Sequence, residues 1–344
     1  MTFQFRIITL LALFFSIQSM AQSKQRYQSE IDSIILQTQP RPFNGVILIT
    51  KKGKTIYKKT HGFVDLEAKT PLKFDDRFEI MSNTKQMTSV LVLKEVEKGK
   101  IDLHSSIKKY LPKLSQSWAD SVTVHQLLNH THGIVDVEKP LLFRPGTDYK
   151  YGNLSNILLG KIIENVTHKT YREMATALFK SLGMKNTSLY VENKNPKLVK
   201  GYMNDNNQFS TPKLTMITEE NAPADGVVTT IEDLAIWNNK LHKGKILSQK
   251  MYDLMTKNTV FSQHNVFGKE KQGYGYNIRV ASEYNVNYFG HTGLGDGFAS
   301  MNIYIPKSDL SIIVLENQMN ENPDLYYYYE TIIKKIILKS ELVD

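Results

Sequence analysis

The strand-forming segments of this chain lie near its two ends, and a long, mostly helical stretch separates them. Residues 43–50 and 55–62 are rich in β-branched and aromatic side chains, and the link Lys51-Lys52-Gly53-Lys54 predicts that they form a hairpin. Similar segments return only later, at residues 274–280, 286–289, 298–305 and 311–315. This arrangement predicts one antiparallel sheet assembled from both ends of the chain.

Helices complete the expected architecture. They are predicted near residues 29–36 and 324–339 and throughout the stretch between the two groups of strands. We therefore expect an α+β fold in which an α/β part of about residues 22–75 and 265–344 carries an inserted, mostly helical part of about residues 76–264. The seam between the two parts is the expected place for a site.

The first residues are typical of a targeting segment. Arg6 precedes an apolar run at residues 7–17, which is shorter than the roughly 20 residues that span a bilayer. Ser19 and Ala21 are the small residues that a signal peptidase recognises, so we expect residues 1–21 to be a cleaved signal peptide. An uncleaved membrane anchor is the alternative. If the signal peptide is cleaved, residues 22–344 are expected to be exported, periplasmic or secreted, with no further membrane span.

The composition narrows the chemistry that is available to the chain. Cysteine is absent, which excludes disulfides and thiol catalysis and leaves His and carboxylate side chains as metal ligands. The formal net charge is +9, but the lysines are scattered and no nucleic-acid-binding motif occurs. For an exported basic protein of this kind, we expect contact with anionic polymers of the cell envelope and not binding to nucleic acid.

Ser82 and Lys85 form the first catalytic candidate. Residues 78–81 look extended, and apolar residues then recur at three- and four-residue spacing up to Gly99, which predicts a helix that starts at Ser82. Residues three apart lie on one face of a helix, so the Lys85 amine can reach the Ser82 hydroxyl. The unpaired N–H groups of a first helical turn can stabilise an oxyanion. The geometry suits a serine nucleophile with a lysine base.

The Ser-x-x-Lys spacing is weak by itself. Ser82 could equally be an ordinary helix cap. The same spacing recurs elsewhere in the chain, at Ser105/Lys108, Ser106/Lys109 and Ser210/Lys213. The other motifs of the chain must therefore decide between the two interpretations.

A turn that ends in Tyr151 and Asn153 is the second candidate. A phenol among cationic neighbours can lose its proton below its ordinary pKa of about 10 and relay a proton, and an Asn amide can bind a substrate carbonyl. The same Tyr-x-Asn spacing recurs at Tyr202 and Asn204. A buried tyrosine followed by a turn asparagine is the structural alternative.

A glycine-rich segment at residues 288–298 is the third candidate. Its glycines allow a close backbone approach along a strand edge, where a substrate could be laid as an extra strand. His291 could supply a hydrogen bond there, or a positive charge at low pH. A bend between two strands is the alternative interpretation.

A metal site is a further hypothesis. His130, His132 and Asp136 could ligate zinc, but a metallohydrolase would need more ligands at tighter spacing. The preceding helix is expected to end at Gly133 as a C-cap glycine would end it. A structural turn is therefore favoured over zinc.

The three motifs occur in the order Ser-x-x-Lys, Tyr-x-Asn and His-Thr-Gly, and together they carry a family resemblance. The chain resembles the penicillin-recognising serine hydrolases, a superfamily that includes class C β-lactamases, D-Ala-D-Ala carboxypeptidases, penicillin-binding-protein-like proteins and esterases. The likeness covers about residues 43–317 and includes supporting segments such as Pro145-Gly146-Thr147. It implies a β-lactamase/transpeptidase-like fold.

The resemblance also implies a role for each candidate residue. Ser82 would be the acylated nucleophile, and Lys85 its proton acceptor or the charge that keeps Tyr151 basic. Tyr151 would activate the deacylating water, and Asn153 would bind the substrate amide. The backbone N–H groups of Ser82 and Leu294 would form the oxyanion hole. The rest of the implied substrate-binding edge consists of His291, Thr292 and Gly293.

The departures from the family pattern concern the substrate. His291 stands where β-lactamases usually carry a Lys that anchors a carboxylate, and neutral His is a poorer clamp near pH 7. Within the superfamily, His at this position resembles peptidases and esterases more than antibiotic-resistance enzymes. Gly152, Asn156 and His132 also depart from the family pattern; they leave the catalytic set intact and bear on whether the family's pocket shape applies to this chain.

We therefore expect an exported serine hydrolase that cleaves an amide or ester through an acyl-Ser82 intermediate, without a metal or organic cofactor. The leading expectation is a D-Ala-D-Ala carboxypeptidase-like enzyme or a D-amino-acid peptidase, acting on small molecules or peptides such as peptidoglycan fragments. The alternatives within the fold are a carboxylesterase and a β-lactamase. A non-catalytic penicillin-binding or envelope scaffold protein is the alternative of another class.

Overall fold

The computed structural model describes residues 26–192 and 194–343, so the expected signal peptide at residues 1–21 lies outside the described residues. Within the described ranges, none of the helices combines the length and the apolar character that crossing a membrane requires. The first described element is a helix over residues 26–35, close to the predicted range.

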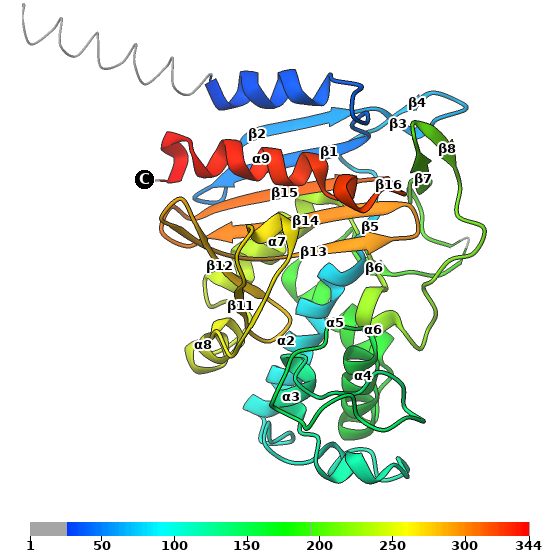
Figure 1. Cartoon of the computed structure of the whole chain (residues 1–344), viewed down its shortest axis with the longest axis vertical. Coiled ribbons are helices and arrows are strands. Elements are labelled where there is room, and N and C mark those ends of the chain that lie inside the picture. The colour runs from blue at the N-terminus through cyan, green and yellow to red at the C-terminus, as the bar shows by residue number, and fades with distance from the viewer. Residues whose placement is uncertain (1–25, 193, 344) are drawn as a thin grey trace, which may run out of the picture.

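One eight-stranded antiparallel sheet organises the fold (Figure 1). Its strands β1 (Gly45–Lys51) and β2 (Lys54–His61) form the predicted hairpin. β1 also pairs along its whole length with β15 (Leu310–Glu316), near the other end of the chain. The prediction of a sheet built from both ends is therefore confirmed. From β15 the sheet continues through β14 (Phe298–Ile305), β13 (Val286–Gly295), β12 (Arg279–Glu283), β11 (Gln272–Tyr274) and β10 (Val260–Ser262).

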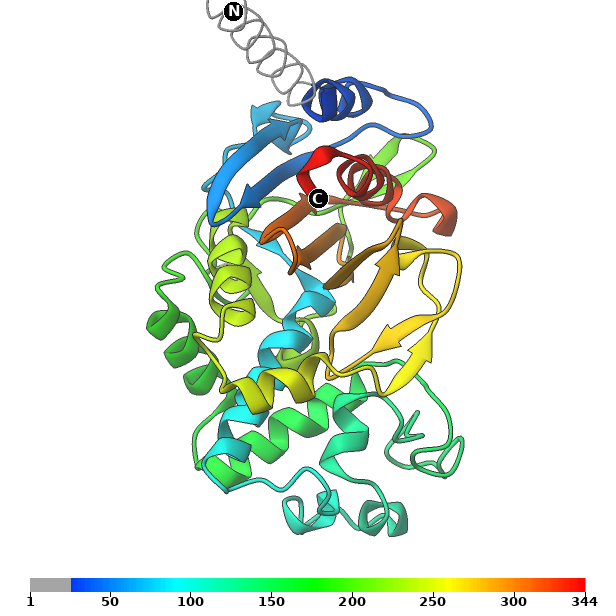
Figure 2. The ribbon, with the colours of Figure 1, turned by 90° about the vertical axis from the view of Figure 1, so that its left-hand side faces the viewer.

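Helices cover both faces of this sheet (Figure 2). The helix at residues 26–35 and α9 (Tyr328–Leu338) pack in one core, and α2 (Thr84–Glu97) and α7 (Ile231–His242) pack in the other. Side chains of β1 alternate between the cores, because successive residues of a strand point to opposite faces. Ile47 and Ile49 enter the first core, whereas Val46 and Leu48 enter the second. This explains why β1 is apolar at four consecutive positions.

The helical region surrounds α2, which is buried along nearly its whole length. Its other helices are α3 (Val124–Leu128), α4 (Leu154–Thr167), α5 (Tyr171–Leu182), α6 (Ala222–Asp225) and α8 (Gln249–Thr256). The short 3-10 helices are η1 (Met81–Asn83), η2 (Ile107–Lys109), η3 (Ser117–Asp120), η4 (Asn265–Phe267), η5 (Pro323–Leu325) and η6 (Glu341–Val343).

Small sheets connect distant segments of the chain. One contains β7 (Tyr202–Asp205), β8 (Gln208–Ser210) and β16 (Gln318–Asn320), and β3 (Phe63–Asp65) pairs with β4 (Thr70–Pro71). The third sheet contains β5 (Phe78–Glu79), β9 (Val227–Thr229) and β6 (Ser188–Leu189).

The pairing of β5 with β9 positions the candidate site. Phe78 lies opposite Thr229, and the Ile80 N–H donates to the Val227 carbonyl at 3.0 Å. Because the strands run antiparallel, the residues that follow β5 lie beside those that precede β9. The segment that carries Ser82 is thereby placed next to α6.

Two predicted boundaries in the C-terminal half are wrong. Residues 274–280 do not form one strand, because β11 ends at Tyr274 and β12 begins at Arg279. Between them Asn277 adopts a left-handed φ of 52°, and its buried amide donates to Ser89 Oγ at 2.8 Å. In addition, β13 continues past Phe289 to Gly295, so most of the glycine-rich segment is strand and the bend between the two strands is confined to Asp296 and Gly297.

The predicted helix end at Gly133 is also wrong. The helix α3 stops at Leu128, five residues earlier, because residues 129–133 form a compact turn. Within this turn His130 has a φ of 59°, and Gly133 has a φ of 74° against the Phe143 carbonyl. A Cβ at Gly133 would lie 2.5 Å from that oxygen, so the glycine serves a turn instead of a helix cap.

Candidate active site

Ser82 lies in η1, a single turn between β5 and α2. Met81, directly before it, has a φ of 47°, a conformation that costs a non-glycine residue about 1–3 kcal/mol. Met81 is buried, so packing of the surrounding core holds it in this conformation.

The predicted helix is confirmed, since α2 begins at Thr84 and Gly99 follows its end with a φ of 70°. The Ser82 side chain makes no cap hydrogen bond, so the cap interpretation is wrong.

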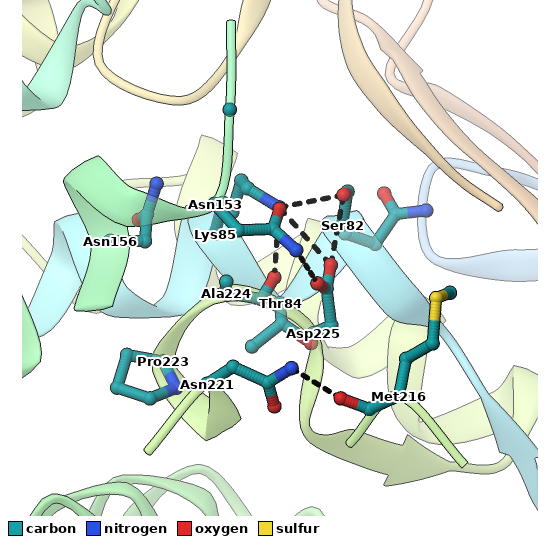
Figure 3. A network of polar contacts seen from close by, with 12 residues as sticks. Ser82, Thr84, Lys85, Asn153, Asn156, Met216, Asn221, Pro223, Ala224 and Asp225 are labelled. Atoms are coloured by element: carbon teal, nitrogen blue, oxygen red, sulfur yellow. Dashed lines mark hydrogen bonds and ion pairs between the residues drawn. The ribbon is translucent and has the colours of Figure 1, made fainter. Parts of the chain in front are cut away.

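Lys85 lies on the same face as Ser82 and is completely buried (Figure 3). Its Nζ donates to Ser82 Oγ at 2.6 Å, to the Ala224 carbonyl at 3.1 Å and to Asp225 Oδ1 at 3.1 Å. Burial lowers the pKa of Lys85, while the charge of Asp225 and the hydrogen bond to it oppose that change. The ammonium group is therefore held against the nucleophile by three oxygen acceptors.

Tyr151 lies close to this ammonium group. The Lys85 Nζ is 5.3 Å from the centroid of the Tyr151 ring, and the ring centroid of His291 is 6.0 Å from that of Tyr151. Burial raises the pKa of Tyr151 above its ordinary value, and the nearby Ser82 hydroxyl offsets only part of the rise. The structure therefore favours a neutral phenol, in contrast to the expectation that cationic neighbours would lower this pKa.

Asn153 immediately precedes α4 and remains exposed. Its Nδ2 donates to Asp225 Oδ2, so one donor of the amide is already occupied (Figure 3). The remaining donor and the carbonyl oxygen are the groups with which Asn153 could bind a substrate amide.

His291 lies in β13, beside the other predicted substrate-binding residues. Its Nδ1 donates to the carbonyl oxygen of Thr292 at 2.7 Å, and its Nε2 accepts from the Tyr274 hydroxyl at 3.0 Å. Burial, followed by the positive charge of Arg279, holds the pKa of His291 well below its ordinary range. His291 is therefore a neutral hydrogen-bonding group and not the positive charge considered from the sequence.

Gly293 brings β13 against the turn that carries Ser82. A Cβ on Gly293 would lie 2.1 Å from the Ile80 carbonyl oxygen and 2.9 Å from the Met81 Cβ. Only glycine permits this approach, and the partly exposed Leu294 follows it in the strand. The backbone of β13 is thus close to η1, as the predicted oxyanion hole between Ser82 and Leu294 requires.

The neutrality of His291 gives a testable pH dependence. Because its pKa lies well below 6.5, we expect the ratio of KM values of His291→Gln and wild type to be constant from about pH 5 to pH 8. The ratio would be measured with a peptide that ends in a free carboxylate. A step in the ratio near pH 6.5 would show that a charged His291 anchors the carboxylate.

Each histidine of the zinc hypothesis has at least one protein partner. His132 Nδ1 accepts from the Ile134 N–H at 2.9 Å, whereas its buried Nε2 has no partner among the described residues. His130 Nε2 pairs with Asn277 Oδ1 at 3.0 Å, and its Nδ1 pairs with Ser155 Oγ at 3.1 Å. Burial lowers the pKa of His132 to about 4, and Asp136 pairs with a lysine. No three His, Asp or Glu side chains are grouped to hold a metal ion in the described part of the chain. This arrangement agrees with the structural turn that the sequence favoured.

Two charged residues at the site were missed by the sequence analysis. Asp225 contacts both Ser82 and Lys85, although 143 residues separate it from Ser82. Arg279 in β12 is paired in register with Gly290, next to His291, and is only 4% exposed. Neither residue belongs to a recognisable local motif, so only the folded chain reveals them.

A family model described as Beta-lactamase matches residues 39–333. Protein flp of Staphylococcus aureus (strain N315) is 28% identical over 326 residues, which cover 86% of this chain and 64% of that protein. The chain thus spans less than two thirds of the length of this curated relative.

Solved structures share the fold. The octameric penicillin-binding protein homologue from Pyrococcus abyssi has a TM-score of 0.78 and 24% identity, with 94% of this chain and 78% of that chain covered. The D-amino acid amidase from Ochrobactrum anthropi SV3, complexed with D-phenylalanine, has a TM-score of 0.75 and 21% identity, with 91% of this chain and 99% of that chain covered. The expected β-lactamase/transpeptidase-like α+β fold is therefore confirmed. Because the family model matches most of its length, the chain belongs to the beta-lactamase family.

Proposed function

We propose that this protein is a serine hydrolase that cleaves an amide or ester bond through an acyl-Ser82 intermediate. One observation carries the proposal: Lys85 Nζ lies 2.6 Å from the partly exposed Ser82 Oγ, at the start of the central helix of a beta-lactamase-family fold. A cation at this distance stabilises the serine alkoxide that attacks a carbonyl carbon. The proposed reaction requires no metal or organic cofactor.

We further propose that the substrate is a peptide that ends in a free carboxylate, as a D-Ala-D-Ala carboxypeptidase-like enzyme or a D-amino-acid peptidase would require. The names of two structural neighbours, a penicillin-binding protein homologue and a D-amino acid amidase, support an amide of this kind. Because His291 is neutral, the carboxylate needs another cation, and Arg279 is the available candidate.

Arg279 has the properties of an incompletely paired cation. Its Nη1 donates to Ser262 Oγ at 2.8 Å, and its guanidinium carbon lies 5.3 Å from the ring centroid of Tyr274, the partner of His291. Among the described residues, no carboxylate pairs with Arg279, and its buried Nε has no hydrogen-bond partner. Buried arginines are normally paired, so a substrate carboxylate is a suitable missing partner.

Arg279→Gln is expected to weaken binding of carboxylate-ended substrates. Hydrogen bonds to charged groups contribute about 1.5–3 kcal/mol, so KM for an acyl-D-Ala-D-Ala peptide should rise roughly 10- to 150-fold. The same peptide with an amidated C-terminus is the matched control, and its KM should hardly differ between the variant and wild type. An equal loss for both peptides would remove Arg279 from substrate recognition.

The function is tested by intact-mass measurement and product analysis on the wild type. We expect an acyl adduct with benzylpenicillin, or release of D-Ala from an acyl-D-Ala-D-Ala peptide, and neither with Ser82→Ala. Turnover of a short nitrophenyl ester alone would indicate the carboxylesterase, and rapid hydrolysis of benzylpenicillin would indicate the β-lactamase. The complete absence of adduct and turnover across the panel would instead favour the non-catalytic scaffold.

We also propose that the protein is exported, to the periplasm or beyond the cell. The support is the sequence of residues 1–21, with Arg6, an apolar run and the small residues before the expected cleavage site. Export would bring the enzyme to peptidoglycan fragments, the substrates that we propose. N-terminal sequencing of the protein recovered outside the cytoplasm is expected to begin at residue 22.

A further inference from the structure

Asp225 is the residue at the site for which the predicted mechanism has no role. It is the last residue of α6, and its side chain is 7% exposed. The Ser82 hydroxyl donates to Asp225 Oδ1 at 3.0 Å, and Lys85 Nζ donates to the same oxygen at 3.1 Å. The second oxygen, Oδ2, accepts from Asn153 (Figure 3). One carboxylate therefore contacts the nucleophile and two of its predicted partners.

Lys85 is poorly arranged to accept the proton of Ser82. An ammonium group has three donors and no lone pair. All three donors of Lys85 have acceptors, namely Ser82 Oγ, the Ala224 carbonyl and Asp225 Oδ1. The single proton of the Ser82 hydroxyl is directed to Asp225 Oδ1, so Ser82 Oγ must accept from Lys85, and this third donated contact requires an N–H bond that a neutral amine lacks. The arrangement is that of a charged lysine that donates to the serine oxygen.

Tyr151 is also poorly prepared to accept this proton. Burial raises the pKa of its phenol, and the neighbouring charge of Asp225 raises it further. A phenolate would have to form beside a carboxylate, on a side chain that is partly shielded from solvent. The titratable groups that face Asp225 are thus Lys85 from α2 and Tyr151 from the segment before α4. The carboxylate is the acceptor toward which the Ser82 O–H bond already points.

We propose that Asp225 is a further catalytic residue, the general base that accepts the proton of Ser82. This inference rests on the proposed serine-hydrolase function. In acylation the Ser82 O–H bond breaks, its proton passes to Asp225 Oδ1, and Oγ bonds to the substrate carbonyl carbon, whose π electrons move to the carbonyl oxygen. When this intermediate collapses, the bond to the leaving group breaks and the leaving group takes the proton from Asp225.

Deacylation repeats the same proton transfers with water. Water gives a proton to Asp225 as its oxygen attacks the acyl carbon, and the proton returns to Ser82 Oγ when the ester bond breaks. Lys85 keeps its proton throughout and stabilises the negative charge that develops on Oγ. A carboxylate is a weak base for a serine hydroxyl. The adjacent Lys85 cation makes the proton transfer more favourable, because it stabilises the alkoxide that forms.

The test uses the near-isosteric variant Asp225→Asn, assayed with the substrate that the wild type turns over. We expect kcat to fall about 10²- to 10⁴-fold with little change in KM. We also expect the decline of kcat on the acid side of the wild-type pH profile to disappear in the variant. Asp233→Asn is the matched control, because Asp233 is a buried aspartate of α7 that bonds Asn186 and Thr187. It should leave the pH profile unchanged.

Chemical rescue separates a base from a purely structural carboxylate. In Asp225→Gly, added formate should restore kcat at least tenfold and saturably, whereas sodium chloride at equal ionic strength should not. A wild-type kcat in Asp225→Asn, or an acid-side decline that persists unchanged in it, would overturn the inference. An inactive wild type would overturn the proposed function together with this inference, so the two failures are distinguishable.

Discussion

Ser82→Ala is expected to lower kcat by about six powers of ten, the loss measured when a serine hydrolase is deprived of its nucleophile. The variant should form no covalent adduct with benzylpenicillin. The Ser82 side chain makes no cap contact, but its removal leaves one donor of the buried Lys85 without its acceptor, so the free energy of unfolding should fall by about 1–3 kcal/mol. Steady-state kinetics, intact mass and chemical denaturation provide the measurements.

Ser210→Ala is the matched control for this variant. Ser210 has the same Ser-x-x-Lys spacing to Lys213, but it lies in β8 and is exposed. Its removal should leave kcat unchanged. If Ser82→Ala kept more than a tenth of the wild-type activity while remaining free of contaminating enzyme, Ser82 would not be the nucleophile.

Lys85→Met is expected to have the second-largest effect, with two consequences. The loss of the ammonium from Ser82 Oγ should lower kcat by about three to four powers of ten, through weaker stabilisation of the alkoxide. It should also destabilise the fold by about 3–5 kcal/mol, because Asp225 would be left as an unpaired buried charge. The two effects are measured by steady-state kinetics and by chemical denaturation.

A double variant separates these two effects. Lys85→Met/Asp225→Asn removes both charges of the buried pair, so the free energy of unfolding should recover most of its loss while activity stays low. Lys213→Met, at the equivalent spacing on the surface, should change neither quantity. Recovery of activity in the double variant would show that Lys85→Met acts only through folding.

Much of the fold could be predicted because its signals are local. The β-branched and aromatic side chains of residues 43–50 and 55–62 and the Lys-Lys-Gly-Lys link identify the hairpin before any tertiary contact is known. The pairing of Ser82 with Lys85 is equally local, since helical geometry places residues three apart on one face. Prediction from local signals failed at two places. The helix ends before Gly133 because the turn at His130 overrides the local preference. The strand at residues 274–280 is interrupted because the buried polar contacts of Asn277 override it.

The protonation states at the site could not be predicted in this way. Tyr151 and His291 lie in segments whose sequence suggested a lowered tyrosine pKa and a chargeable histidine. Burial raises the pKa of Tyr151 and lowers that of His291, and burial depends on every element packed around a residue. A sequence motif specifies the type of a group but not its solvation.

The sequence by itself determined the α+β architecture, the sheet from both chain ends and the Ser82/Lys85 pair, because these follow from periodicity and short-range helical geometry. Only the tertiary structure placed Asp225 against Ser82 and left Arg279 beside His291 without a carboxylate partner among the described residues. The physical reason for Asp225 is strand pairing, because β5 joins β9 across a spacing that no local pattern records. For Arg279 the reason is burial, which depends on every element packed around the residue.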